Sequence, residues 1–357
     1  MTLRIPIDAV FKALADPTRL RIARLLATME LAVGELAQVL GQSQPRVSRH
    51  VGILCDAGLA ERRREGSWVF LRGTGMADDA APLIAAIDRM LAIAEAEEPG
   101  FAKSCEDDRR KLAAIRDARE DAANQYFARH AGEWDDLRAL HTPDAQVEEQ
   151  LIAALGEHAI GSLLDIGTGT GRIAELFMDS AARIVALDKN LEMLRVARAK
   201  LQHLPTAQIE LVQGDFTDLP FEATSFDTVV LHQVLHFAAD PAIVLAEAAR
   251  VTRPQGRIAI VDFAAHDHEE LRSRHQHARL GFSDRQMSSL LRRSGFKPGS
   301  PVALDGGQLV VKIWIGERVP ALSAKGALSG KHLTANSMRS SSPPAQKALS
   351  SVKKATS

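Results

Sequence analysis

Three glycines at alternate positions are the clearest sign of chemistry in this 357-residue chain. They are Gly167, Gly169 and Gly171, and they follow the apolar segment 162–166, which predicts a buried strand. Glycines let the backbone pass close to a ligand at the start of the helix that we expect next. A dinucleotide fold would place its third glycine one position later, where this chain has Arg172, so the spacing argues against a nicotinamide cofactor.

Two carboxylates follow the next two predicted strands. Asp188 ends the segment 183–187 and is placed to accept hydrogen bonds from ribose hydroxyls. Asp215 ends the next strand, where it is placed to meet an exocyclic amine, and Phe216 offers an aromatic wall beside it. Glycines and carboxylates at the ends of three successive strands are a more specific signal than the glycine motif alone. They predict a nucleotide-type ligand site.

The first part of the chain has the pattern of a DNA-binding module. Helical apolar spacing predicts two helices within residues 6–28, with Asp16 and Pro17 at the turn, and a third helix that Gly41 ends. A fourth helix opens at Ser43, and two strands joined by an arginine-rich turn complete a winged helix. The residues expected to contact DNA are Gln44, Arg46, Ser48 and Arg49 in the helix and Arg62, Arg63 and Arg64 in the wing. The alternative for the wing arginines is that they only solvate a hairpin tip.

Composition and charge indicate a globular protein whose charge is unevenly distributed. The formal net charge is −1, yet the first 75 residues are rich in arginine and residues 78–157 are strongly acidic. Residues 317–357 are rich in Ser, Ala and Lys and predict a disordered basic tail, either a solvated extension or a weak nonspecific nucleic-acid contact. No apolar run reaches the roughly 18 residues of a membrane span, and there is no signal-peptide core, so we expect a cytoplasmic protein.

Cysteines and histidines offer few candidates for metal binding or catalysis. Cys55 and Cys105 have no Cys or His partner at ligand spacing, so we expect neither a disulfide framework nor a zinc site. The histidine-rich segment 266–277 lacks the HExxH pattern, which favours ordinary exposed side chains over the alternative of a metal site. His232 and His236, after the predicted fourth strand, are candidates for deprotonating a nucleophile, the alternative being that they only line the ligand pocket.

The segments 13–22, 45–51 and 57–66 resemble the ArsR-type regulators, over about residues 5–95. The resemblance implies a homodimer, joined through the first helix and the helix near 82–96, that reads a palindromic operator as a repressor. Metal-sensing members place cysteines in the third helix, where this chain has Ala32 and Gly34, which cannot coordinate a soft metal. Arsenic sensing at that position is therefore not expected.

The glycines and carboxylates resemble those of the class I methyltransferases that bind S-adenosylmethionine (SAM), over roughly residues 120–316, and in particular those of the ubiquinone and menaquinone C-methyltransferase-like group. The resemblance implies a cofactor site made of Asp165, Gly167, Thr168, Gly169 and Gly171 at the methionine part, Asp188 at the ribose, Lys189, Met193, Asp215 and Phe216 at the adenine, and Leu231 and His232 at the carboxy end. Tyr126-Phe127 and Trp134-Asp135 resemble the segment that closes over the cofactor, the alternative being an amphipathic helix packed on the sheet. Arsenite methylation is not expected, because the two cysteines lie in separate contexts.

We therefore expect a multidomain protein, with an α-rich ArsR-type winged helix (1–96), an acidic helical linker (97–125), an α/β Rossmann-like methyltransferase domain (126–316) and the tail (317–357). Two functions are open. The chain is a repressor of operator DNA that senses SAM or S-adenosylhomocysteine (SAH), or it is an active methyltransferase of a small molecule whose winged helix regulates its own gene or localises it. No membrane partner is expected.

Overall fold

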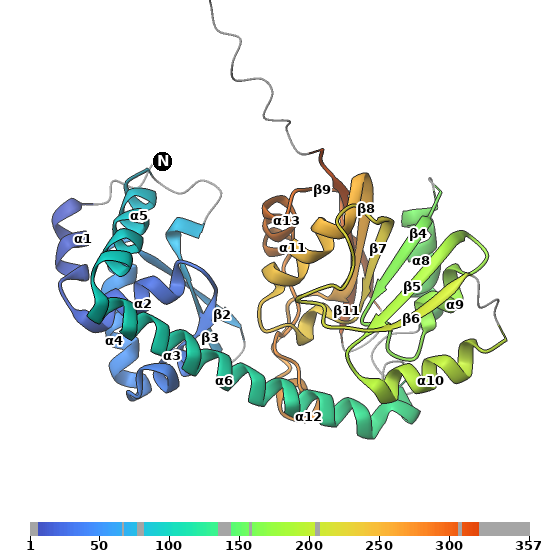
Figure 1. Ribbon diagram of the computed structural model, residues 1–357, viewed down its shortest axis with the longest axis horizontal. Helices are drawn as coiled ribbons and strands as arrows, with labels where there is room; N and C mark the ends of the chain where they lie inside the picture. Colours follow the sequence, from blue (N-terminus) through green and yellow to red (C-terminus); the bar gives the residue numbers. More distant parts are fainter. Residues whose placement is uncertain are drawn as a thin grey trace, which may run out of the picture. The chain divides into compact units, whose positions relative to one another are not determined.

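The computed structural model describes residues 6–65, 68–76, 82–134, 144–156, 159–203, 208–305 and 309–320, and both expected domains are present (Figure 1). The wing tip at 66–67 and the predicted tail from residue 321 onward lie outside the described residues. Among the described helices, none is long and apolar enough to cross a membrane.

The first domain is a winged helix. Its elements are α1 (Ile7–Leu14), α2 (Pro17–Leu26), β1 (Leu31–Ala32), α3 (Val33–Leu40), α4 (Gln44–Asp56), β2 (Ala60–Glu65), β3 (Trp68–Gly73), η1 (Thr74–Met76) and α5 (Pro82–Glu97). As the sequence predicts, the Asp16 side chain accepts from the Arg19 N–H, Pro17 occupies the first position of α2, and Gly41 ends α3 with a left-handed φ of 62°. The three strands form an antiparallel sheet in the order β1-β3-β2, so β3 is the central strand.

The predicted linker is part of one 32-residue helix, α6 (Pro99–His130), which continues past the expected domain boundary at residue 125. The helix continues because no glycine or proline interrupts the chain between residues 101 and 130. Its first half packs on the winged helix, where Leu112 is buried in the core and the Arg21 guanidinium pairs with Asp108. Its last turns carry Tyr126 and Phe127 to the second domain.

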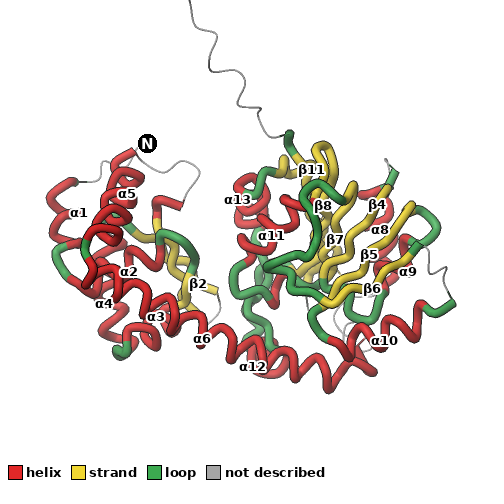
Figure 2. Tube along the Cα trace, in the orientation of Figure 1, coloured by secondary structure: helices red, strands yellow, loops and turns green. Residues whose placement is uncertain are grey.

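The second domain is built on a twisted, mostly parallel sheet, with helices on both sides (Figure 2). Its elements are η2 (Ala131–Glu133), α8 (Asp144–Leu155), β4 (Gly161–Ile166), α9 (Arg172–Phe177), β5 (Ala181–Asp188), α10 (Leu191–Leu201), β6 (Ile209–Gln213), β7 (Phe226–His232), η3 (Leu235–Phe237), α11 (Pro241–Val251), β8 (Thr252–Phe263), α12 (Glu270–His275), α13 (Asp284–Arg293), β9 (Phe296–Pro298), β10 (Val302–Asp305) and β11 (Val310–Arg318). The strand order is β10-β11-β8-β7-β4-β5-β6, with β9 paired to β11. The order reverses between β4 and β7, the position at which open α/β sheets bind ligands.

Alternation along each strand separates the core of this domain into two layers. Leu163 of β4 faces the layer that α8, α9 and α10 cover, whereas the next residue, Leu164, faces the layer of α11 and α13. Because both faces of the central strands are buried, these strands are nearly continuous apolar runs. The polar side chains are left to the strand ends, which is where the candidate site lies.

Candidate functional site

The glycine loop after β4 has a backbone that only glycine adopts without strain. Gly167, Gly169 and Gly171 have φ values of 70°, 54° and 86°, all in the left-handed region. A Cβ on Gly167 would lie 2.5 Å from Cγ2 of Val234, so this position also requires close approach of the backbone to the end of β7. The Gly167 N–H donates to the carbonyl of Leu187, 2.8 Å away, which fixes the loop to the end of β5.

Asp188 lies at the end of β5 and braces the same loop. Its Oδ2 accepts from the Gly169 N–H at 2.8 Å and its Oδ1 from the Asn190 N–H at 2.8 Å. Burial raises the pKa of this carboxyl, although the backbone N–H groups partly offset the effect. Each oxygen of an ionised carboxylate has a further lone pair, so Asp188 can accept ribose hydroxyls while it holds the loop.

The loop opens on a cavity of about 450 Å³ at the carboxyl ends of β4, β5 and β7. Its volume is within the range of small-molecule sites. Most of the predicted cofactor residues line it, namely Asp165, Gly167, Thr168, Gly169, Asp188, Lys189, Met193, Phe216 and His232. Phe127 and Trp134 also line it, with their ring centroids 5.3 Å apart in an edge-to-face arrangement. The aromatic pair therefore contributes to the cavity and does not only pack on the sheet.

Three predicted cofactor residues lie outside the cavity wall. Gly171 begins α9, and a Cβ there would meet Cδ1 of Leu201 instead of a ligand. Leu231 is fully buried in the core between β7 and the layer of α11. The Asp215 carboxylate is occupied by Lys189 Nζ at 2.8 Å and by the backbone N–H and hydroxyl of Thr217. The strand pattern placed these residues at the correct edge of the sheet. Their side chains do not line the cavity, because they point elsewhere or pair with neighbouring residues.

The two candidate histidines differ in their surroundings. His232 lines the cavity, whereas His236 is 2% exposed and does not. His236 Nδ1 lies 2.8 Å from Oδ1 of Asp262, and its backbone N–H donates to Oδ2 of the same carboxylate. This arrangement holds η3 against β8, which is a structural position. His277 also lines the cavity, and its ring centroid is 4.1 Å from that of His236.

Oγ1 of Thr168 and Nε2 of Gln233 are buried polar atoms of the wall that have no hydrogen-bond partner among the described residues. The two residues are 6% and 8% exposed. Gln233 also has a left-handed φ of 54°, a strained conformation for a residue with a side chain. Buried polar groups without partners are costly, and a ligand with oxygen and nitrogen atoms in the cavity would satisfy them. The site therefore fits a polar cofactor, and Gln233 is a residue that the sequence analysis did not identify.

The winged helix and α6 contribute to the same wall. Trp68 and Phe70 of β3 line the cavity, together with Arg116 and Arg119 of α6. On the side of the second domain, the wall includes Arg272 and residues 276–279. No sequence signal marked this contact, because it joins residues about 200 positions apart.

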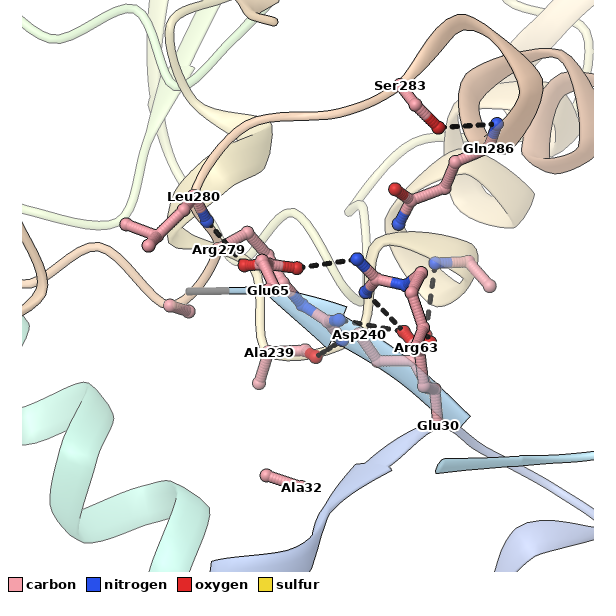
Figure 3. A network of polar contacts seen from close by, with 12 residues as sticks. Glu30, Ala32, Arg63, Glu65, Ala239, Asp240, Arg279, Leu280, Ser283 and Gln286 are labelled. Carbon is pink, nitrogen blue, oxygen red and sulfur yellow. Dashed lines mark hydrogen bonds and ion pairs between the residues drawn. The ribbon is translucent and has the colours of Figure 1, made fainter. Parts of the chain in front are cut away.

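Glu65, the last residue of β2, binds the second domain (Figure 3). Its side chain is 4% exposed and accepts from Arg272 Nη2 at 2.7 Å, from the Leu280 backbone N–H and from Arg63 Nη1 at 2.7 Å. Arg272 also lies over the Trp68 ring, 4.5 Å from its centroid. The end of the wing is thus fixed to the segment that lines the cavity.

Glu30 forms the second half of this contact. It accepts from Arg279 Nη1 at 2.7 Å and from Arg63 Nη2 at 3.2 Å, and the Arg279 guanidinium lies 4.2 Å from the Phe70 ring centroid. Burial alone would raise the pKa of Glu30, but Arg279 and Arg63 hold it below its usual value. Glu30 is therefore an ionised partner of both arginines at neutral pH, and Arg63 lies between Glu30 and Glu65.

The predicted DNA-binding residues lie on an exposed face. Gln44, Arg46, Ser48 and Arg49 are exposed on α4, opposite the buried Val47, Val51 and Leu54. In the wing, Arg62 and Arg64 are exposed, whereas Arg63 is partly buried. Alternation along β2 explains the difference, since it directs Arg63 to the opposite face of the strand from its two neighbours.

The histidine and cysteine side chains of the described residues do not form a metal-binding arrangement. Among these residues, no group of three or more His, Cys, Asp or Glu side chains could hold a metal ion. In the histidine-rich segment, His268 Nδ1 lies 2.9 Å from Glu270, and His275 Nδ1 lies 2.7 Å from the hydroxyl of Tyr126. Cys55 and Cys105 are both free thiols.

Comparison with known proteins supports the two-domain interpretation. Residues 16–62 match the family model "Bacterial regulatory protein, arsR family", and residues 164–260 match "Methyltransferase domain". The first match agrees with the winged helix, and the second with the α/β domain and with the SAM-type cofactor expected for it. Together they confirm the predicted combination of domains.

Curated relatives each match only one part of the chain. The arsenical resistance operon repressor of Escherichia coli K12 is 47% identical over 73 residues, covering 20% of this chain and 62% of that protein. A demethylmenaquinone methyltransferase of Renibacterium salmoninarum is 34% identical over 114 residues, covering 32% of this chain and 46% of that protein. The chain thus spans less than half the length of this methyltransferase. Among solved structures, a methyltransferase of Burkholderia thailandensis with bound SAH is 19% identical, with a TM-score of 0.45, over 56% of this chain and 89% of its own.

Proposed function

Because the chain joins an ArsR-family helix-turn-helix to a methyltransferase domain, we propose that it is a transcriptional repressor whose operator affinity depends on SAM or SAH. The observation that carries the proposal is the shared wall of the cavity. Strand β3 of the wing lines it, and Glu65 at the end of β2 binds Arg272 of the second domain, which lines it too. A ligand that moves this wall therefore acts directly on the DNA-binding domain.

The cofactor is proposed to bind across the glycine loop. Gly167, Thr168 and Gly169 would hold its methionine part, and the Asp188 carboxylate would accept the ribose hydroxyls. Met193 would pack on the adenine, among the other residues at the ends of β5 and β6. SAM and SAH differ by a methyl group and a positive charge on sulfur, so a site near the charged wall can distinguish them.

Operator DNA is proposed to bind α4 and the outer face of the wing. The exposed polar residues of α4 would reach base edges, while Arg62 and Arg64 would contact phosphates. Arg63 was predicted as a third wing contact, but its guanidinium bridges Glu30 and Glu65. We therefore assign Arg63 to the contact between domains.

The DNA-binding form is proposed to be a homodimer that acts in the cytoplasm. Two helix surfaces support the assembly, since Ile7 and Phe11 of α1 are 48% and 56% exposed, and Met90 and Ile93 of α5 are 44% and 58% exposed. Exposed apolar pairs at helical spacing are typical of a surface that another protein covers. A second copy of this chain would cover them and would match a palindromic operator.

Methyl transfer to a small molecule is the second candidate function, favoured by the aromatic part of the cavity wall. Phe127, Trp134 and Phe237 form an aromatic cluster there, which can hold an acceptor and exclude water. SAM supplies an activated methyl group, so the protein needs mainly to align the acceptor and dehydrate it. Of the two candidate bases only His232 lines the cavity, and it would take the proton that the acceptor loses.

Fluorescence anisotropy on the DNA upstream of the gene tests the proposal. Affinity is measured at one salt concentration with no ligand, with SAM and with SAH, since salt alone changes the affinity. We expect one of the two ligands to change the affinity by about 5-fold to 150-fold. Tight binding that is indifferent to both ligands would exclude the sensor function and leave methyl transfer as the function of the second domain.

A further inference from the structure

One part of the cavity wall differs in kind from the glycine loop. It is lined by Trp68 and Phe70 of the wing and by Arg116 and Arg119 of α6. None of these residues belongs to the glycine loop or to the strand ends that would hold a nucleoside. Flat aromatic side chains beside guanidinium groups are suited to a flat molecule that carries negative charge.

Arg116 differs from the other arginines of this wall because it has no carboxylate partner among the described residues. Arg119 pairs with Glu35 at 2.8 Å, Arg272 with Glu65 at 2.7 Å and Arg279 with Glu30 at 2.7 Å. Within the described part of the chain, Arg116 instead approaches a backbone carbonyl, that of Glu30, at 3.5 Å. Its Nε is buried without a hydrogen-bond partner among these residues. Arg116 therefore lines the cavity with a charge that no carboxylate of the described residues balances.

Gln233 supplies an independent indication of a ligand in the same cavity. Its Nε2 is a buried donor without a partner in the described part of the chain, and the residue is held in a strained left-handed conformation at the end of β7. Strained residues persist where the surrounding structure requires them, and they concentrate at ligand sites. Both unpartnered groups are donors, so the complementary ligand presents acceptor oxygens.

We propose that the cavity binds, beside the cofactor, a small planar aromatic anion, such as an aromatic carboxylate, with Arg116 as its counter-ion and Gln233 as a second donor. The inference rests on the proposed function, because it names the class of the second ligand of the cofactor cavity. Since Trp68 and Phe70 belong to β3, this ligand contacts the wing directly. It is therefore in a position to act as the effector of DNA binding as well as a methyl acceptor.

The test is calorimetric titration of the full-length protein, saturated with SAH, with 2-naphthoate and with its neutral isostere 2-naphthamide. We expect 2-naphthoate to bind with a stoichiometry of one per chain and to bind more tightly than the amide. Arg116→Gln should weaken binding of 2-naphthoate roughly 10-fold or more and leave the amide unchanged, since a hydrogen bond to a charged group is lost. Arg116→Lys, which keeps the charge, should restore part of the affinity.

Arg110→Gln is the matched control, because Arg110 lies on the same helix in an ion pair with Glu106 in which both side chains are 69% exposed. It should change neither affinity. Gln233→Gly removes the donor and also suits the left-handed backbone, so it should raise the melting temperature while it weakens binding of 2-naphthoate. A higher melting temperature together with weaker binding of 2-naphthoate shows that the variant has lost a ligand contact and has kept its fold.

Equal weakening of the binding of both probes by Arg116→Gln would overturn the inference. So would competition between 2-naphthoate and SAH, or a protein that binds SAH but does not bind 2-naphthoate. Failure of the proposed function gives a different result, namely no binding of SAH itself to the wild-type protein.

Discussion

Replacing Glu65 by Gln should disconnect the cofactor cavity from DNA binding. The substitution keeps the shape of the side chain but removes a negative charge that is 4% exposed and that accepts from Arg272, Arg63 and the Leu280 N–H. The amide retains one acceptor oxygen, so it can satisfy part of this set. One of its donor hydrogens will also face a guanidinium, which is unfavourable.

The energetic cost of the substitution follows from the burial of the Glu65–Arg272 pair. Removing one partner of a buried ion pair costs about 3–5 kcal/mol, because the remaining charge is left without compensation. Arg272 is 7% exposed, but it retains the Trp68 ring and the Ala278 carbonyl, so we expect a cost near the lower limit, about 3 kcal/mol. Coupling between two ligand sites is typically 1–3 kcal/mol. The loss is therefore large enough to abolish the coupling, provided that the coupling passes through this contact.

The assay is operator anisotropy with and without SAH, accompanied by calorimetry of SAH binding. We expect the change in operator affinity on adding SAH to fall to about 2-fold or less in Glu65→Gln, while SAH still binds. Glu61→Gln is the control on the same strand, since the Glu61–Arg72 pair has side chains 56% and 31% exposed and contributes little. A Glu65→Gln protein that binds SAH and keeps the wild-type response would refute the reasoning, as would an equal loss in Glu61→Gln.

The remaining predictions concern the cofactor loop, the dimer and the dependence on pH. Gly167→Ala should abolish SAH binding in calorimetry, because a Cβ at this position has no room. Gly41→Ala is the control, since Gly41 has a similar φ of 62° but open space around it. It should cost only about 1 kcal/mol of stability and leave SAH binding intact. Phe11→Glu should convert a dimer to a monomer in light scattering and weaken operator binding, and Ile152→Glu, a similarly exposed apolar site on α8, should do neither. Burial, together with neighbouring histidines, lowers the pKa of His266 to about 4, so the unfolded chain binds a proton that the folded chain does not as the pH falls from about 6.5 to 4. Stability measured by urea unfolding should therefore decrease over that range, and His266→Asn should reduce the decrease; an unchanged pH profile would contradict the assignment.

Local patterns predicted the elements well because their causes are local. The cap at Asp16, the stop at Gly41 and the alternation of apolar residues in β4 each depend on a few neighbouring residues. The same is true of the glycine loop, whose left-handed backbone is a property of the glycines themselves. Leu231 and Asp215 show the limit of such patterns. A position at a strand end does not fix which way the side chain points or which neighbour it pairs with.

By itself the sequence determined the two domains, the type of each, the strand edge of the ligand site and the exposed face of α4. These features follow from periodicity, capping and glycine spacing, which are physical properties of short segments. Only the tertiary structure decided that the wing lines the cofactor cavity and that Arg63 turns toward Glu30 and Glu65 instead of sharing the face of its neighbours. The reason is that ion pairs such as Glu65–Arg272 join residues about 200 positions apart, and the charge of either residue alone carries no information about its partner.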